Sequence, residues 1–277
     1  MPASPTVAVT GCSSGIGEAI ALGLRDRGYR VVATARTEGD LERLDAAGLE
    51  PLALELADPD SVAACAQAIA ERSQGGLRGL VNNAAYGQPG AVEDLSRDVL
   101  RRQFEVNLLG THDLTARLLP VMREQGAGRV VQISSLLGLV ALGYRGAYNA
   151  SKFALEGLTD TLRLELAGSG VQAVLIEPGP ITSRFREHAY RAFQANIDAD
   201  NSYHRAVYER DIAARLAGTE DAPFTLGPEA VLAKTVKALE KRRPRPRYYV
   251  TFPTYLLAGL KWVLPARWLD PFLRRIS

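Results

Sequence analysis

The chain has 277 residues and a formal net charge of +2, and 47% of its residues are hydrophobic against 23% charged. This balance is that of a globular protein and excludes a disordered chain, and so small a charge does not indicate nucleic acid as a partner. The length fits one α/β domain. Cys12 and Cys65 give neither a disulfide framework nor a zinc-binding spacing, which favours a reducing compartment.

A strand-like run starts almost at the first residue, without the charged and apolar segments of a signal peptide. The most apolar late stretch, 255–264, contains Lys261 and is shorter than the ~20 residues that a membrane-spanning helix needs. We therefore expect a cytoplasmic protein. His188 and His204 have no cysteine or carboxylate at metal-binding spacing, so no metal site is expected.

Short apolar runs alternate with helix-patterned segments along the chain. Strands are expected at residues 6–10, 30–35, 51–56, 79–82, 129–133, 171–176 and 248–252, and helices at 16–27, 61–72, 99–124, 147–166 and 229–240. The strand runs are apolar on both faces, which fits strands covered by helices above and below. Repeated strand–helix–strand order implies right-handed crossovers. The sequence predicts one domain, 1–277, with a Rossmann-like, doubly wound parallel sheet of about seven strands and helices on both faces.

Two segments break this alternation. Residues 180–226 are rich in Arg, Tyr, Phe and His and lack a strand pattern, and residues 253–277 form an apolar C-terminal tail that resembles an amphipathic helix. Each segment is a candidate cover over a binding cleft, the first as a lid insertion, or else a surface helix packed on the core. Between them lies a basic run, 241–247, which is either a solvated linker or a contact for an anionic partner.

The first expected strand leads into a glycine-rich loop, 11–17, after which the first helix begins. Glycines permit a tight turn and let the backbone approach a pyrophosphate. The helix N-terminus offers unpaired N–H groups and a partial positive charge to an anion. The sequence therefore predicts a dinucleotide site formed by Gly11, Ser13, Ser14, Gly15, Ile16 and Gly17.

The second expected strand ends at Ala35 and Arg36, where the adenine ribose of a dinucleotide should lie. A carboxylate at this position would repel a 2′-phosphate, whereas a guanidinium pairs with it in a forked geometry. We therefore expect a preference for NADP(H), with Arg36 as the contact. The alternative is an ordinary exposed arginine at a strand end.

Tyr148 and Lys152 lie four residues apart in a helical pattern and share one helix face. A phenol has a pKa near ~10. A nearby ammonium and the positive ring of NADP⁺ would both favour its phenolate form and bring the tyrosine toward the pH at which acid–base catalysis is effective. Upstream, a buried run at 130–133 ends in Ser134 and Ser135. Without that context, such a Tyr–Lys pair is usually an exposed surface pair.

The pattern Thr10-Gly11-x-x-x-Gly15-x-Gly17 differs from the G-x-G-x-x-G of most Rossmann proteins. Together with Tyr148-x-x-x-Lys152 it resembles the short-chain dehydrogenase/reductase family. The resemblance places the catalytic serine at Ser135, whose hydroxyl would donate to the substrate oxygen and steady the charge that grows there. The neighbouring Ser134 is the position at which a control substitution would be made.

The resemblance also assigns roles to residues between these motifs. It implies that Asn107 helps to hold a water that links the lysine to solvent; otherwise Asn107 is an ordinary polar helix residue. The run 80–85 is similar to the family's N-N-A-G strand end, which puts Asn83 and Ala84 at the cofactor. The run departs from the family at Ala85, where glycine is usual, and this puts the local backbone shape in question.

After the sixth expected strand, the chain is similar to the family's P-G turn that faces the nicotinamide. The residues concerned are Pro178, Gly179, Ile181 and Thr182. The carboxamide contact belongs either to Thr182 or to Ser183, which stands where the family often has threonine. The family's aspartate near the adenine aligns with Glu55, and Asp58 follows three positions on, so that contact is left open.

The resemblance implies an oxidoreductase that transfers hydride between NADP(H) and an apolar carbonyl or alcohol substrate, with aldehyde or ketone reduction as the expected direction. Ser135 and Tyr148 would hold the carbonyl oxygen, and Tyr148 would donate the proton that Lys152 and Asn107 replace from water. The segments 177–181 and 247–251 look like the bacterial aldehyde-reductase branch, which is similar to 17β-hydroxysteroid and retinol dehydrogenases; these are the alternative activities. Five aromatic residues either line an apolar pocket or pack a lid helix: Phe185, Tyr190, Phe193, Tyr203 and Tyr208.

Two other functions compete with this one. A non-catalytic NADP(H)-binding sensor is possible in this fold, although it has no need of Ser135, Tyr148 and Lys152 together. A membrane-peripheral enzyme would be held by the tail after Pro253 and by the basic run 242–247. The family resemblance suggests a homodimer or homotetramer.

Overall fold

The computed structural model describes residues 4–73, 76–212 and 223–276. A seven-stranded sheet forms its centre, with the order β3-β2-β1-β4-β5-β6-β7 and every neighbouring pair parallel. The strands are β1 (Thr6–Val9), β2 (Arg30–Ala35), β3 (Glu50–Ala53), β4 (Leu77–Asn82), β5 (Gly128–Ile133), β6 (Val171–Glu177) and β7 (Arg247–Tyr249). The predicted Rossmann-like, doubly wound parallel sheet is confirmed.

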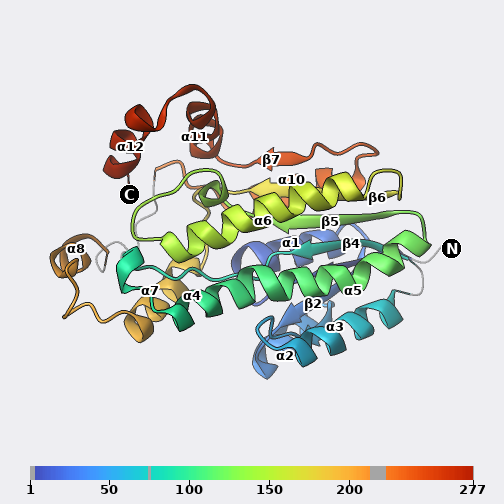
Figure 1. Cartoon of the computed structure of the whole chain (residues 1–277). Coiled ribbons are helices and arrows are strands. Elements are labelled where there is room, and N and C mark those ends of the chain that lie inside the picture. The colour runs from blue at the N-terminus through green and yellow to red at the C-terminus, as the bar shows by residue number, and fades with distance from the viewer. Residues whose placement is uncertain (1–3, 74–75, 213–222, 277) are drawn as a thin grey trace.

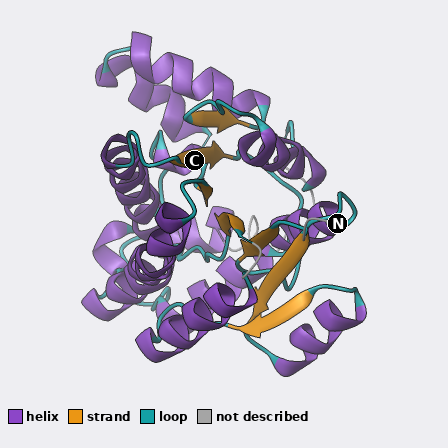
Figure 2. Cartoon of the chain, turned by 90° about the vertical axis from the view of Figure 1, so that its right-hand side faces the viewer, coloured by secondary structure: helices purple, strands orange, loops and turns teal. Residues whose placement is uncertain are grey.

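Helices cover both faces of this sheet (Figures 1 and 2). The α-helices are α1 (Gly15–Arg25), α2 (Glu38–Ala46), α3 (Pro59–Arg72), α4 (Arg97–Phe104), α5 (Thr111–Glu124), α6 (Gly146–Glu165), α7 (Phe185–Asn196), α8 (Arg205–Val207), α10 (Glu229–Glu240), α11 (Phe252–Val263) and α12 (Ala266–Arg275). Short helical turns are η1 (Val92–Asp94), η2 (Glu105–Gly110), η3 (Leu136–Gly138) and η4 (Tyr208–Ile212).

Successive side chains of a strand point to opposite faces of the sheet, so the apolar strands contribute to two apolar layers, one on each face. Val7 and Val9 of β1 pack in one cluster with Leu24 of α1 and Leu239 of α10. Ala8, between them, packs in the other cluster with residues of α3 and α5. The continuous apolar strands expected from the sequence are therefore buried on both sides.

Several boundaries differ from the expected ones. The third strand ends at Ala53 rather than at residue 56. The seventh strand is Arg247–Tyr249, and Phe252 already begins α11, where a proline in the first turn is compatible with a helix start. Helix α2 was not predicted; it is short and mostly polar, and Thr37 caps it by accepting from the backbone N–H of Asp40.

The single helix expected at 99–124 is three pieces: α4, the π-helical turn η2 and α5. π-Helical turns inside helices are rare and occur frequently at functional sites. At Gly110, the last residue of η2, there is no space for a side chain. A Cβ there would lie 1.9 Å from the carbonyl oxygen of Leu56, in the loop after β3. The turn also carries Asn107, which thereby leaves the regular helical register.

Because all strands run in parallel, their carboxyl ends lie along one edge of the sheet. Helices α7, α8, α11 and α12 gather at this edge (Figure 1). The basic run that precedes β7 lies at the opposite edge, where Arg129 at the start of β5 donates to the Lys241 carbonyl at 3.2 Å. The tail and the basic run therefore lie at opposite ends of the strands, and a membrane contact that joins them stays a prediction.

Candidate active site

The loop between β1 and α1 has the shape that its glycines allow. Gly11 and Gly15 have φ values of +70° and +60°, in the left-handed region that side chains disfavour. At Gly17 a Cβ would lie 2.1 Å from the Gly11 carbonyl oxygen, so no side chain fits there without moving the backbone. The glycines therefore hold the backbone of this loop in a tight concave path.

The start of α1 suits an anion. Its N-cap, Ser14, makes no capping hydrogen bond through its side chain, so the first-turn N–H groups are not occupied by it. Cys12 anchors the loop from beneath: its backbone N–H donates to the Thr34 carbonyl at 2.8 Å, and burial raises the pKa of its thiol to about 12. Cys12 is a packing residue rather than a nucleophile. The loop fits the pyrophosphate of a dinucleotide.

The end of β4 is tied to the same loop. The side-chain amide of Asn83 donates to the carbonyl oxygens of Thr10 at 2.9 Å and Gly11 at 3.1 Å, and the backbone N–H of Ala84 donates to the Thr10 hydroxyl at 3.0 Å. β1 and β4 are the neighbours at which strand order reverses, which is where ligands bind in open α/β sheets. Ala85 is not among the described non-glycine residues with positive φ, so its backbone does not require glycine.

Arg36 follows β2 directly, and 70% of its side chain is exposed. Its guanidinium lies 3.8 Å from the carboxylate of Glu55. Asp58 caps α3 by accepting from the backbone N–H of Asp60 at 3.0 Å, so its carboxylate is already engaged. Arg36 remains accessible at the edge where the adenine ribose of a cofactor is expected.

Arg43 of α2 is a candidate that the sequence did not reveal. Its guanidinium donates to the Ser13 carbonyl at 2.6 Å and pairs with Glu18 at 2.7 Å. A second cation thus lies against the glycine-rich loop. Because the sequence pattern does not predict α2, no sequence signal points to Arg43.

The structure brings Ser135, Tyr148 and Lys152 together at the carboxyl edge of β5. The ammonium of Lys152 donates to the Ile133 carbonyl at 2.8 Å and lies 5.7 Å from the centre of the Tyr148 ring. The Ser135 oxygen accepts from the backbone N–H of Leu137 at 3.0 Å. Their proximity follows from the strand end, which positions Ser135, and from the four-residue spacing on α6.

The electrostatics of the pair differ from the expectation. Burial raises the pKa of Tyr148 to about 12, and a hydrogen bond with Ser135 acts in the opposite direction. Burial also lowers the pKa of Lys152 to about 8, against the attraction of Glu156. Desolvation disfavours both charged forms and is the largest influence on each pKa.

Asn107 holds three segments together. Its side-chain amide donates to the Tyr86 carbonyl at 2.9 Å and to the Ser151 hydroxyl at 3.2 Å, and its oxygen accepts from the Tyr86 backbone N–H at 3.1 Å. Ser151 is the neighbour of Lys152. Asn107 therefore joins the loop after β4 to the helix that carries the tyrosine and the lysine.

A charge cluster with two buried glutamates lies one turn further along α6. Arg247 of β7 pairs with the carboxylates of Glu156, Glu177 and Asp160. Burial raises the pKa of Glu177 to about 8, and its repulsion from Glu156 adds to this. One cation cannot balance three nearby carboxylates. The sequence did not predict this cluster, although two of its members lie in the segments that resemble the aldehyde-reductase branch.

The P-G turn after β6 packs closely on its surroundings. The Pro178 carbonyl accepts from the Leu136 backbone N–H at 2.7 Å, which links the turn to the residue after Ser135. A Cβ at Gly15 would lie 3.0 Å from that of Ser183, while the backbone N–H of Thr182 donates to the Leu226 carbonyl at 3.0 Å. Ser183 thus lies beside the glycine-rich loop, and the carboxamide contact remains a prediction for either residue.

The candidate lid, residues 180–226, is described up to residue 212 and from 223 onward; residues 213–222 lie outside the described part. Its aromatic side chains do not form one pocket wall. Phe193 and Tyr208 are buried against each other with ring centres 5.1 Å apart, whereas Tyr203 is 91% exposed. Phe185 packs edge-on against Tyr148 at 5.3 Å. Of the five aromatics, Phe185 is the one placed against the candidate catalytic tyrosine.

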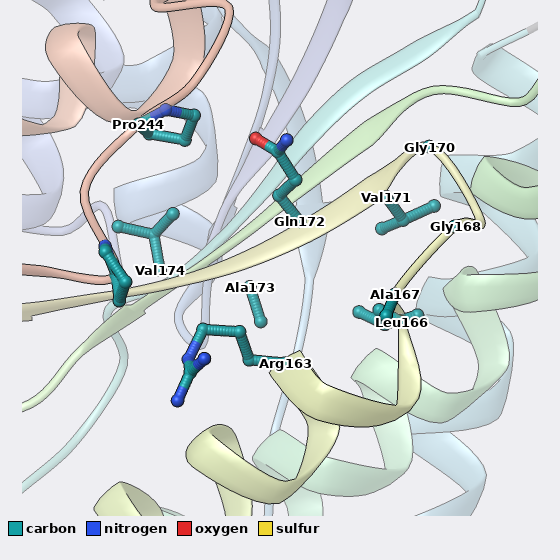
Figure 3. Close-up of a pocket in the computed structure, with 11 residues that line it drawn as sticks. Arg163, Leu166, Ala167, Gly168, Gly170, Val171, Gln172, Ala173, Val174 and Pro244 are labelled. Atoms are coloured by element: carbon teal, nitrogen blue, oxygen red, sulfur yellow. The ribbon is translucent and has the colours of Figure 1, made fainter.

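A separate pocket of about 250 Å³ lies at the other end of α6, between the start of β6 and Pro244 (Figure 3). Arg163 is its one ionisable lining residue, so nothing in its lining suggests chemistry. Within the described ranges, no group of three or more His, Cys, Asp or Glu side chains is placed to hold a metal ion. None of the helices in those ranges is long and apolar enough to cross a bilayer.

Comparisons with known proteins agree with this geometry. The oxidoreductase YbbO of Escherichia coli strain K12 is 41% identical over 269 residues, which cover 97% of this chain and 94% of YbbO. Retinol dehydrogenase 5 of Homo sapiens is 34% identical, with 99% of this chain and 89% of that protein covered. The 17-beta-hydroxysteroid dehydrogenase type 1 of Homo sapiens is 35% identical, with 90% and 78% covered.

Solved structures show the same fold. Actinorhodin polyketide ketoreductase with NADPH superposes with a TM-score of 0.73 at 28% identity, covering 90% of this chain and 97% of that one. A short-chain dehydrogenase/reductase from Burkholderia phymatum in complex with NAD gives 0.75 at 27% identity, covering 94% and 92%. The family model described as short chain dehydrogenase matches residues 5–192. The chain therefore belongs to the short-chain dehydrogenase family and is an oxidoreductase.

Proposed function

We propose that the protein transfers hydride between NADP(H) and an apolar carbonyl or alcohol substrate, with reduction of aldehydes or ketones as the main direction. One observation carries the proposal. A phenol and an ammonium of α6 meet the hydroxyl that follows β5 at the carboxyl edge of the sheet, the same edge at which the glycine-rich loop leaves β1.

The preference for NADP(H) is supported by Arg36. Its exposed guanidinium follows the strand that should face the adenine ribose, and its partner Glu55 is 3.8 Å away in solvent, a weak pair that a phosphate would displace. Arg43 also contacts the loop through the Ser13 carbonyl, but Glu18 and Asp40 already balance its charge, so the preference rests on Arg36. The structural relatives bind either cofactor, NADPH in one and NAD in another, so the choice depends on this chain's own residues.

A bound nicotinamide would supply or accept the hydride, and in its oxidised form would add a positive charge near Tyr148. The Leu137 N–H occupies one lone pair of Ser135, and the serine O–H, which bonds with Tyr148 in the protein alone, would turn to a substrate oxygen. Tyr148 then donates its proton to that oxygen. Lys152, whose pKa of about 8 lies close to neutrality, restores the proton, and Asn107 with Ser151 positions the helix around it.

An apolar substrate is supported by what surrounds this end of the sheet. Phe185 contacts Tyr148, and Leu136 and Val140, which follow Ser135, pack against Leu257 of α11. The names of the relatives favour a second candidate, the oxidation of retinol or of a 17β-hydroxysteroid. Both candidates share the same residues and differ in substrate and direction.

We further propose that the enzyme works in the cytoplasm as a homodimer or homotetramer. Both cysteines are free and buried, as suits a reducing compartment. Leu109 of η2 and Leu164 of α6 are exposed large apolar residues of the kind that a subunit contact would cover.

The proposal is tested by measuring turnover of aldehydes, ketones, retinol and 17β-hydroxysteroids with each cofactor in wild type and in Ser135→Ala, with Ser134→Ala as the matched control. We expect faster turnover with NADPH than with NADH. Ser135→Ala loses one hydrogen bond to the charge that develops on the substrate oxygen, and this should lower kcat about 100-fold or more. Cofactor binding without turnover of any substrate would support the sensor instead.

A further inference from the structure

The two C-terminal helices present an apolar face that the rest of the chain leaves uncovered. Leu257, Leu269 and Leu273 pack inward against Leu136 and Val140. Large side chains next to them point outward, and the most exposed are Trp262 at 87%, Val263 at 78% and Trp268 at 61%. These helices stand at one end of the molecule beyond β7 (Figure 1).

The pattern of α12 explains why this face stays open. Residues of a helix advance by about 100° each. Trp268 precedes the buried Leu269 by one residue, and Phe272 precedes the buried Leu273 in the same way. Both aromatic side chains therefore point about a quarter-turn to the same side of the buried leucines. The apolar arc of α12 is wider than the part that packs on the protein, and its outer half holds the two aromatics.

The charges around this face are mostly positive. Between residues 252 and 276 the cations are Lys261, Arg267, Arg274 and Arg275, and the single acid is Asp270. Lys261 donates to the Leu139 carbonyl and lies 4.6 Å from the Phe153 ring. Arg267 lies 5.4 Å over the Trp268 ring, and none of the three arginines forms an ion pair with another residue in the part of the chain that the structure describes.

A second copy of the chain fits this face poorly. A twofold interface brings a surface patch against itself, so the basic rim would meet the same basic rim. A bilayer with anionic lipids fits both properties, because tryptophans settle at the boundary between headgroups and acyl chains while arginines pair with phosphates.

We propose that the outer face of α11 and α12, centred on Trp262 and Trp268, docks the protein on the surface of a bilayer that contains anionic lipids. The helices lie on the surface rather than span it. Because α11 follows the carboxyl end of β7, docking would turn the candidate active site toward a phase in which apolar carbonyl compounds dissolve. That benefit rests on the proposed function, but the docking itself does not.

The test is co-sedimentation of the full chain, without substrate, with vesicles of phosphatidylcholine alone and with added phosphatidylglycerol. Wild type should pellet with the anionic vesicles, less so at high salt. The double variant Trp262→Ser/Trp268→Ser and the triple variant Arg267→Glu/Arg274→Glu/Arg275→Glu should each weaken binding about tenfold or more. Unchanged thermal unfolding would show that these exposed substitutions leave the fold intact.

Two controls match these variants. Tyr203→Ser removes an equally exposed aromatic from the lid, and Arg242→Glu/Arg243→Glu reverses charges at the opposite edge of the sheet. Both should bind like wild type. Wild-type protein that pellets with neither vesicle, or weakening that follows the Arg242 variant, overturns the proposal. So does a Trp262/Trp268 variant that binds vesicles normally but loses its dimer in ultracentrifugation, because a second copy would then cover the face. NADPH turnover, measured separately, reports on the enzymatic proposal alone.

Discussion

The glycine-rich loop and the lid show two ways in which one chain builds the surroundings of a site. In the loop, backbone contacts set the shape: Gly17 has no room for a side chain, and Asn83 fixes the carbonyls of Thr10 and Gly11. In the lid, side chains pack on each other, with Tyr208 and Phe193 forming a small core of their own. The first kind of region tolerates few residue types at each position, whereas the second can change its surface while keeping its core.

Among the changes that separate the loop from the candidate lid, the largest expected effect is in the loop. In Gly17→Val, the new side chain must displace the Gly11 carbonyl, which lies 2.1 Å from the position of its Cβ. Overpacking of about 1–3 kcal/mol at the cofactor site corresponds to a ten- to hundredfold loss in NADPH affinity, measured by titration calorimetry. Gly39→Ala is the control, because that position on α2 has open space and should keep wild-type affinity. Equal affinities of the two variants would show that the loop's shape is not what binds the cofactor.

The second effect concerns the edge of the same site. Arg36→Asp should raise KM for NADPH about ten- to hundredfold and change KM for NADH far less, because a charge-assisted contact with the 2′-phosphate is replaced by repulsion. Arg101→Asp, on the exposed side of α4, controls for net charge. Equal changes for both cofactors would contradict the role of Arg36.

The third effect tests the lid's own core. The Tyr208 hydroxyl accepts from the Ala91 backbone N–H at 2.8 Å and donates to Asp94. Tyr208→Phe leaves both groups without that partner and should destabilise the lid by about 1–3 kcal/mol, seen as faster proteolysis of the lid. Tyr203→Phe, at an exposed ring, should have no effect. NADPH affinity should stay the same in both variants; a loss in Tyr208→Phe would mean that lid and loop are not separable.

The smallest effect is a pH dependence of stability. Burial raises the pKa of Glu177 from its ordinary value near 4.5 to about 8. Between these two pH values the folded protein keeps a proton on Glu177 that the unfolded chain releases. Wild-type stability should therefore fall as pH rises from 5 to about 8, with Glu156 sharing the titration. In Glu177→Gln the urea midpoint should depend less on pH over this range, while Glu124→Gln, on the surface, should follow wild type. An unchanged slope in Glu177→Gln would place the shared proton elsewhere.

What the sequence predicted follows from short-range rules. The strand–helix alternation predicted the sheet, and Tyr148 and Lys152 are fixed by a helical spacing that a linear pattern shows directly. The glycine-rich loop was recognisable because its backbone conformation limits its residue types. Ser135 was assigned through the resemblance to the short-chain dehydrogenase/reductase family, from its place in the serine strand and its spacing to Tyr148.

What the sequence did not show depends on long-range contacts. Arg247 meets Glu156 and Glu177 across 91 and 70 residues, and no periodicity marks such pairs. Arg43 lies on a helix too polar to be recognised. The expected lowering of the Tyr148 pKa considered the nearby ammonium but not burial, which acts more strongly. The sequence pattern does not distinguish an aromatic residue that lines a pocket from one that packs inward, as Tyr208 does.

Tyr148→Phe is the most direct test of the central claim, because it removes one oxygen and leaves the ring packed against Phe185. NADPH binding by fluorescence titration and carbonyl reduction would be measured on the same preparation. We predict affinity within about twofold of wild type and a fall in kcat of about 100-fold or more, since the proton donor is lost. Near-wild-type kcat with intact binding would contradict the assignment of Tyr148 as the group that protonates the substrate.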